Sequence, residues 1–245
     1  QSIAIIPTSS VPRGSNLGPL LFLSFINYIA FIIIGEKLLF VDDLKFFCSV
    51  TSSEDCQKLQ SNINLIYNWC RTNHLYLNIL ECNVITFTKK KTFITCDCYI
   101  EQVILSRHCE VRDLGILFVV QFSFSSQINN TVNSALKTLD FIHKNCKDFH
   151  DEYCLNKLYY TIIRYKLEYC CLKWKFIYLY HKNLIESAQR HFLNMYLIKE
   201  NPSYPPRSVS QQLLLKEFNV MELDTHRIII YITFLYNLIN NKIDC

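Results

Sequence analysis

The chain has 245 residues, of which half are hydrophobic and four are glycine, and this composition excludes a disordered tail. It is long enough to bury one large core or two smaller ones. Its net charge of +4 allows a polyanionic partner without requiring one. Because it opens at Gln1 and has no clear terminal signal at Cys245, we expect a fragment of a longer protein.

Twelve cysteines are irregularly spaced, with no Cys-x-x-Cys, in a chain too long and too apolar to need disulfides. We expect most of them to be reduced, half-buried thiols. His143, Cys146, His150 and Cys154 recur at helical spacing and have ligand chemistry suited to zinc. On one straight helix, however, the first and last would lie roughly 16 Å apart, so all four cannot meet one ion.

Residues 1–16 contain the breakers Pro7, Pro12 and Gly14, which predict an extended lead-in and a loop. The run from Leu17 to Ile34 is about as apolar and as long as a membrane-spanning helix, which needs roughly 20 residues. Polar residues and a proline interrupt this run, so a membrane span stays one alternative and a buried helix the other.

Two adjacent carboxylates, Asp42 and Asp43, stand inside the apolar, strand-like run 37–47. This pattern predicts a hairpin with the acidic pair at its tip. Hard oxygen ligands suit Mg²⁺, which takes few protein carboxylates and completes its shell with water and phosphates. A solvated turn is the other interpretation, and these residues alone leave both open.

The segment 11–27 (VPRGSNLGPLLFLSFIN), taken with Phe40–Asp43, resembles the reverse transcriptase of non-LTR (LINE-type, jockey-like) retrotransposons. In that family a Pro-Gln-Gly-Ser loop and a Leu-Gly-Pro-Leu-Leu-Phe segment precede an aromatic-Ala-Asp-Asp hairpin by a short interval. The resemblance implies that Asp42 binds the catalytic metals, Mg²⁺ or Mn²⁺, and that Asp43 supports it from the same turn. It also makes residues 17–34 the buried helix of the polymerase palm.

The same resemblance places the loop of Pro12, Arg13, Gly14 and Ser15 near the template base and the incoming nucleotide. Arg13 stands where the family usually has Gln, an exchange that preserves phosphate attraction and changes the hydrogen-bond geometry.

Downstream of the acidic pair, Ser52 and Asp55 fit a Ser-x-x-Asp cap for an amphipathic helix that ends near Thr72. Alternation over 75–87 then predicts a strand, and 99–118 predict short strands. The segment 75–82 resembles the family's Leu-x-Leu-Asn-x-x-Lys-Cys, with Glu81 at the Lys position. A carboxylate beside a departing pyrophosphate repels it, so Glu81 argues against efficient catalysis.

From Thr131 onward the apolar period changes to about 3.6, which predicts a mainly helical C-terminal half. Leu155, Leu158, Tyr159 and Ile162 are the predicted core face of one helix. The resemblance extends here through residues 185–190 (IESAQR) and implies a thumb. The basic residues that could face a duplex are Lys137, Lys144, Lys147, Arg164 and Lys166, although ordinary solvated helix faces explain them equally well.

The expected fold class is therefore α+β. Residues 1–125 form a partial palm, 126–200 a helical thumb-like region and 207–245 an incomplete helical extension. The resemblance implies an intracellular, nuclear or cytoplasmic polymerase that copies an RNA template from a DNA primer with deoxynucleoside triphosphates.

The palm also needs a metal-binding Asp on a strand before the Gly14 loop, and this chain begins after that strand. We therefore expect no polymerase activity from the isolated chain. A catalytically dead nucleic-acid-binding remnant and a membrane protein spanning 17–34 remain as alternatives.

Overall fold

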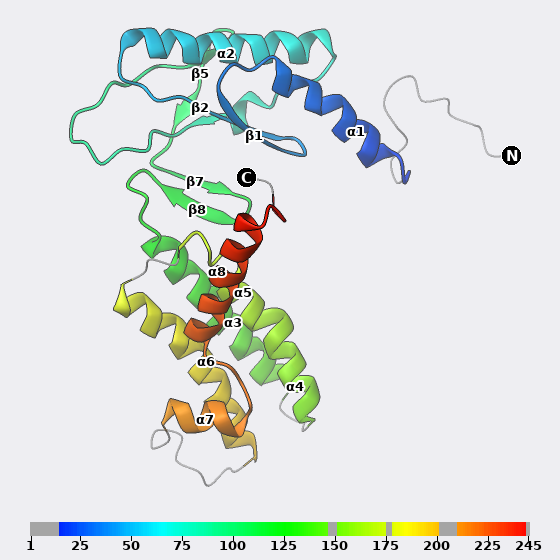
Figure 1. Cartoon of the computed structure of the whole chain (residues 1–245), viewed down its shortest axis with the longest axis vertical. Coiled ribbons are helices and arrows are strands. Elements are labelled where there is room, and N and C mark those ends of the chain that lie inside the picture. The colour runs from blue at the N-terminus through cyan, green and yellow to red at the C-terminus, as the bar shows by residue number, and fades with distance from the viewer. Residues whose placement is uncertain (1–14, 147–150, 175–177, 201–209, 244–245) are drawn as a thin grey trace, which may run out of the picture. The chain divides into compact units, whose positions relative to one another are not determined.

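The computed structural model describes residues 15–146, 151–174, 178–200 and 210–243. The chain divides into two compact units, residues 1–109 and 110–245, here called the N-terminal and C-terminal units. Helices and short strands occur together, which confirms the α+β class (Figure 1).

The N-terminal unit is built around a hairpin and one long helix. The hairpin strands are β1 (Glu36–Phe40) and β2 (Asp43–Phe47), and the helix is α2 (Ser53–Thr72). The other elements are α1 (Gly18–Ile26), the 3₁₀ helices η1 (Asn27–Phe31) and η2 (Ile79–Glu81), and β3 (Asn83–Val84), β4 (Tyr99–Ile100), β5 (Val103–Ile104) and β6 (Ser106–Arg107).

Helix α2 begins and ends as predicted. The Ser52 hydroxyl accepts a hydrogen bond from the Asp55 N–H, and the Asp55 carboxylate accepts one from the Ser52 N–H, so the capping box is complete. Ile66 and Cys70 on the buried face of α2 pack against η1 and the hairpin, while Ile63 belongs to a second cluster beneath β4.

The run 17–34 is neither one helix nor buried in this unit, which corrects the expectation of a buried palm helix. A nine-residue α-helix passes into the 3₁₀ turn η1, and only Ile26, Ile29 and Ile33 are buried. Phe22 and Ile32 are half-buried, and the other large side chains are exposed because the described residues cover only one side of the run. No helix in the part of the chain that the structure describes is long and apolar enough to cross a membrane.

The strand predicted over 75–87 is also corrected. Burial does alternate from Leu75 to Leu80, but the Glu81 N–H bonds to the Asn78 carbonyl and closes a 3₁₀ turn. Ladder pairing is confined to Asn83–Val84, which run parallel to β6. An extended segment can alternate between core and solvent without a strand partner.

One disulfide joins the first turn of α2 to the segment before β4, between Cys56 and Cys96 at 2.01 Å. Nine other cysteines in the described residues are not part of a disulfide, which agrees with the prediction of reduced thiols for most of them.

The C-terminal unit starts with a hairpin and continues as helices. The hairpin strands are β7 (Glu110–Asp113) and β8 (Ile116–Val119). The helices are α3 (Ser125–Asn145), α4 (Glu152–Leu158), the π-helical segment η3 (Tyr159–Arg164), α5 (Tyr165–Glu168), α6 (Leu179–Glu200), α7 (Gln211–Glu217) and α8 (Leu223–Ile239). This order confirms the predicted short strands and helical C-terminal half.

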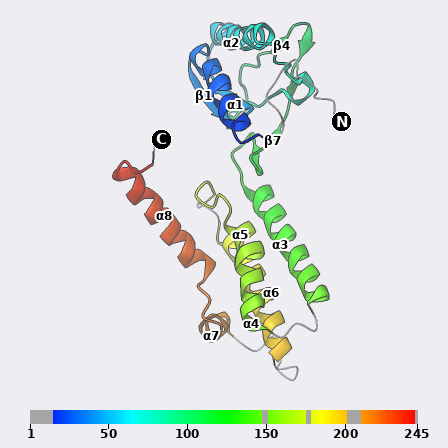
Figure 2. The same ribbon diagram turned by 90° about the vertical axis from the view of Figure 1, so that its right-hand side faces the viewer.

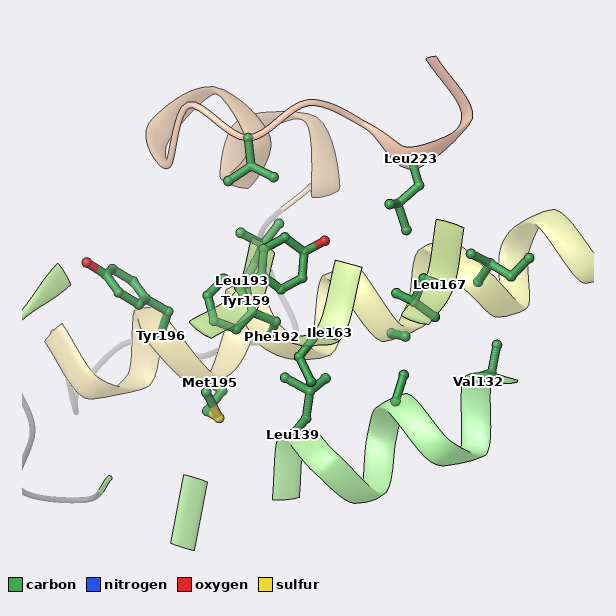
Figure 3. Close-up of a cluster of buried hydrophobic side chains, with 14 of the residues drawn as sticks. Val132, Leu139, Tyr159, Ile163, Leu167, Phe192, Leu193, Met195, Tyr196 and Leu223 are labelled. Atoms are coloured by element: carbon green, nitrogen blue, oxygen red, sulfur yellow. The ribbon is translucent and has the colours of Figure 1, made fainter. Parts of the chain in front are cut away.

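A single apolar core holds these helices together. Val132 and Leu139 point from α3 toward Ile163 and Leu167, and Leu193 of α6 belongs to the same cluster (Figure 3). Leu214 of α7 and Leu223 of α8 are fully buried in it as well. The segment from α7 to the first half of α8 (Figure 2) therefore contributes to this core, whereas Ile232, Tyr236 and Ile239 of the second half of α8 are exposed.

The π-helical segment changes which residues face the core. Leu155, Tyr159, Ile163 and Leu167 are all at most 3% exposed, a spacing of four residues, whereas Ile162 is 36% exposed. The predicted face with Leu158 and Ile162 assumed a 3.6-residue period, and a π turn adds a residue to each turn. Ile163 therefore takes the place expected for Ile162.

The boundary between the two units lies before β7, earlier than the predicted boundary at residue 125. The Leu117 N–H donates to Oε1 of Gln127, which is buried in α3, and Phe118 packs edge-on against Phe124 at 6.1 Å. These contacts attach the β7–β8 hairpin to the helices of its own unit.

Candidate functional site

The acidic pair lies at the tip of the β1–β2 hairpin, as predicted. The register pairs Phe40 with Asp43, which leaves a two-residue turn of Val41 and Asp42. Val41 has a φ of +56°, the left-handed conformation that tight hairpin turns use. Both carboxylates are exposed.

The two faces of this hairpin have different surroundings. Leu39 and Leu44 are paired across the strands and pack on the core of the N-terminal unit. Directly opposed residues share a face, so Asp43 lies with Phe40 on the other face, where Phe40 is 57% exposed. The turn thus holds two adjacent carboxylates beside an uncovered apolar surface.

The donor chemistry of the pair fits a magnesium ion, which accepts one or two protein carboxylates and takes its remaining oxygens from water and substrate. Among the described residues no group of three or more His, Cys, Asp or Glu side chains is arranged to hold a metal ion. A magnesium ion at Asp42 and Asp43 would therefore have to take most of its ligands from water or substrate.

The predicted nucleotide loop lies largely outside the described residues, which exclude Pro12, Arg13 and Gly14. Ser15 is described, and its hydroxyl accepts a hydrogen bond from the Gly18 N–H at 3.1 Å at the start of α1. Glu81, at the end of η2, is exposed.

Helix α3 carries two of the predicted basic contacts on one polar face. This α3 polar face comprises Asn130, Asn133, Ser134, Lys137, Thr138, Phe141 and Lys144, and all of these except Lys144 line a surface depression. Lys166 of α5 reaches the same face, because its Nζ donates to Thr138 Oγ1 at 2.8 Å. Lys147 lies outside the described residues.

Arg164 does not belong to that surface. It is 5% exposed, its Nε donates to Glu168 Oε2 at 3.1 Å, and its Nη1 donates to the Met221 carbonyl. A guanidinium buried and engaged in this way cannot contact the phosphates of a duplex that lies on the surface, so the structure removes Arg164 from the predicted duplex contacts.

Sequence reasoning missed a cleft beside Arg164, which we call the tyrosine cleft. It is lined by Tyr160, Arg164, Tyr165, Glu168, Tyr169, Cys170, Asn219, Met221 and His226. Four of these recur along η3 and α5 and a fifth, Tyr169, directly follows α5, a pattern visible in the sequence. His226 comes from α8, and only the folded chain brings it to Glu168.

The segment 185–190, which carried part of the resemblance, has a structural role here. Glu186 Oε1 accepts a hydrogen bond from the Asp224 N–H at 2.9 Å at the start of α8, and Oε2 accepts one from Nε2 of Gln211, the first residue of α7, at 3.0 Å. Gln189 Nε2 donates to the Met221 carbonyl. Glu186 and Gln189 therefore fasten the last two helices to α6.

Comparison with known proteins gives no family assignment: no family model, no curated protein and no solved structure matches this chain.

Proposed function

We propose that this chain is the palm and thumb part of a non-LTR retrotransposon reverse transcriptase. The observation that carries the proposal is the two-residue turn that exposes Asp42 and Asp43 at the hairpin tip. The motif around residues 11–27, the helix α2 after the hairpin, and the change from strands to helices support it.

In the intact parent, Asp42 would hold the catalytic metal and Asp43 would support it from the same turn. When bound, Mg²⁺ or Mn²⁺ supplies the charge that aligns the primer 3′-hydroxyl with the nucleotide triphosphate. The open face beside Phe40 leaves room for the primer end. Glu81 brings a negative charge to the position at which the family neutralises the leaving pyrophosphate.

For the chain alone we propose the absence of polymerase activity, because two adjacent carboxylates enforce no in-line geometry. Primer extension on an RNA template, with Mg²⁺ and then with Mn²⁺, measures this. The expected result is no template-dependent incorporation. Incorporation that Asp42→Asn abolishes would contradict the inactivity and support the polymerase assignment.

A test of the metal role does not depend on turnover. Mn²⁺ titrated into the ¹⁵N-labelled chain should broaden the amide signals of residues 40–44 first. Asp42→Asn and Asp43→Asn should each weaken that broadening, and Asp97→Asn, which removes an exposed carboxylate of the same unit, should not. Equal broadening in all variants would remove the hairpin tip as a metal site.

A second candidate function is nucleic-acid binding without catalysis, favoured by the α3 polar face. Lysine ammonium groups neutralise phosphates, and the amide side chains of Asn130 and Asn133 donate to backbone oxygens. Phe141, 66% exposed on the same face, adds a ring on which a base or sugar can pack.

Salt dependence tests this candidate. Each phosphate contact contributes about 0.9 to the slope of log affinity against log salt. The double variant Lys137→Ala, Lys144→Ala should therefore flatten the slope for a 20-base-pair duplex by about 2. Lys173→Ala with Lys216→Ala makes the same charge change at exposed sites outside that face and should leave the slope unchanged. Equal slopes for the two double variants would exclude the α3 polar face.

A further inference from the structure

The tyrosine cleft has a polar floor whose charges are already paired. Glu168 accepts hydrogen bonds from Arg164 Nε and Nη2, at 3.1 and 3.4 Å, and its Oε1 lies 2.7 Å from Nδ1 of His226. The side chains of Arg164 and Glu168 are 6% and 11% exposed, whereas that of His226 is 36% exposed. Both oxygens of this carboxylate are therefore already engaged, and its negative charge is paired with Arg164.

This pairing leaves hydrogen-bonding groups of both kinds at the cleft. With Nδ1 held by Glu168, the second ring nitrogen of His226, Nε2, accepts a hydrogen bond in the neutral imidazole and donates one in the imidazolium. Arg164 has five N–H groups, and three of them make the bonds described above. The site can thus meet a ligand edge that carries both donors and acceptors.

The walls of the cleft are aromatic. Tyr165 is 62% exposed and Tyr160 is 40% exposed. The Tyr165 ring is tilted 53° from that of Tyr169, with the centroids 5.8 Å apart, so the two rings do not stack in parallel. Tyr169 is fixed by its hydroxyl, which donates to the Leu114 carbonyl. The cleft therefore offers a broad, uncovered aromatic face beside a fixed ring.

The arrangement selects a flat, neutral group and disfavours a quaternary ammonium ion. A cage for a quaternary ammonium ion consists of several aromatic ring faces that surround a site with no cation of its own. Here the Arg164 guanidinium, 5.3 Å from the centre of the Tyr160 ring, already lies over the face of that ring, and the carboxylate of Glu168 is already paired with Arg164. A planar heterocycle with donors and acceptors on its edge needs neither that ring face nor an unpaired carboxylate, and the volume of about 690 Å³ accommodates it.

We propose that the tyrosine cleft binds one unstacked base of a single-stranded nucleic acid. The base stacks on Tyr165, and its edge bonds to His226 Nε2 and to the remaining N–H groups of Arg164. This proposal rests on the proposed nucleic-acid partner and adds a single-strand site in the C-terminal unit, distinct from the α3 polar face.

The test uses the full chain and a fluorescent twelve-residue oligothymidylate, with anisotropy as the readout. Removing an aromatic ring on which one base stacks lowers affinity roughly tenfold. We therefore expect Tyr165→Ala to bind the oligonucleotide roughly tenfold more weakly than the wild type. Tyr165→Phe keeps the ring and should bind as the wild type does. Tyr153→Ala removes a 68% exposed tyrosine of α4 outside the cleft and should also bind normally.

A second readout locates the base directly. An oligonucleotide carrying one 5-iodouracil, irradiated in the complex, should cross-link to the peptide that contains Tyr160, Tyr165 or Tyr169. Cross-linking confined to other peptides, or equal affinities for Tyr165→Ala and Tyr153→Ala, would overturn the proposal. Displacement of the oligonucleotide by a trimethyllysine peptide, but not by free thymidine, would show a cation site instead.

The outcomes separate this inference from the proposed function. Duplex binding that depends on Lys137 and Lys144, combined with single-strand binding that ignores Tyr165, would overturn only the inference. Failure of the chain to bind either duplex or single strand would overturn the nucleic-acid function together with it.

Discussion

At the scale of single residues, the buried carboxylate of Glu186 serves the end of a distant helix. The first N–H groups of a helix lack partners within it, and Glu186 satisfies one of them at Asp224. Burial raises the pKa of Glu186 above its ordinary value of 4.5, although the Asp224 N–H works in the opposite direction. Glu186 therefore holds the start of α8 with a carboxyl group whose ionised form is disfavoured by burial.

The pH dependence of stability follows from this raised pKa. As pH rises above about 4.5, the unfolded chain ionises Glu186 before the folded chain does, so the free energy of unfolding falls until pH passes the folded pKa. Glu186→Gln keeps a hydrogen-bond acceptor and cannot ionise. We expect the free energy of unfolding of this variant to fall less between pH 4 and pH 7 than that of the wild type, as measured by urea unfolding at the two pH values.

The matched variant Glu186→Ala should lose about 1 to 3 kcal/mol of the free energy of unfolding, because it leaves the Asp224 N–H without its partner. If the alanine and glutamine variants were equally stable at both pH values, the carboxyl group would have no role in holding α8.

At the scale of elements, the π-helical segment η3 decides which side chains of its helix form the core. Local signals fixed several other elements: the Ser52–Asp55 box marks α2, and the acidic pair marks the turn between β1 and β2. No sequence motif near η3 indicates which of its side chains face the core. The extra residue in each π-helical turn is stabilised by packing against α3 and α6, which lie elsewhere in the sequence.

Substitutions of the neighbouring residues Ile162 and Ile163 test which of the two faces the core. Ile163→Ala should lower the free energy of unfolding by about 2 to 5 kcal/mol, because it leaves a cavity in a fully buried site. Ile162→Ala makes the same chemical change at a partly exposed position and should cost less than about 1 kcal/mol. Chemical denaturation of both variants measures the difference, and the reverse order would restore the 3.6-residue phase.

Pairings between distant elements were beyond the reach of sequence patterns. Arg164 has the spacing of a surface basic residue, yet the carbonyl of Met221, 57 residues further along the chain, accepts its hydrogen bond in the interior. Cys56 and Cys96 carry no spacing that distinguishes them from the free thiols. The hydrogen bond of Arg164 and the Cys56–Cys96 disulfide both depend on which segments meet in the folded chain, whereas a periodic pattern describes only one segment.

At the scale of the whole molecule, the two compact units each contain one of the two tryptophans, Trp69 in the first and Trp174 in the second. Trp69 packs near Phe25, and Trp174 is buried under the Arg227 guanidinium. Different surroundings should give each unit its own fluorescence signal. Trp174→Phe leaves Trp69 as the reporter, and Trp69→Phe leaves Trp174.

The Cys56–Cys96 disulfide should then stabilise one unit only. It closes a loop 40 residues long, which corresponds to about 4 kcal/mol in the chain-entropy model. The double variant Cys56→Ser, Cys96→Ser should shift the urea midpoint reported by Trp69 and leave that of Trp174 in place. Cys109→Ser, which removes an exposed free thiol, is the control. Equal shifts of both signals would mean that the chain unfolds as one unit.

In the β1–β2 turn, the strained backbone conformation belongs to Val41 and the negative charge belongs to its neighbour Asp42. A β-branched residue at a φ of +56° costs about 1 to 3 kcal/mol, while its neighbour Asp42 carries the charge. Substitutions of Val41 can therefore raise or lower the stability of the hairpin without changing Asp42 or Asp43. How firmly the turn is held can thus change while the two negative charges of the tip stay the same.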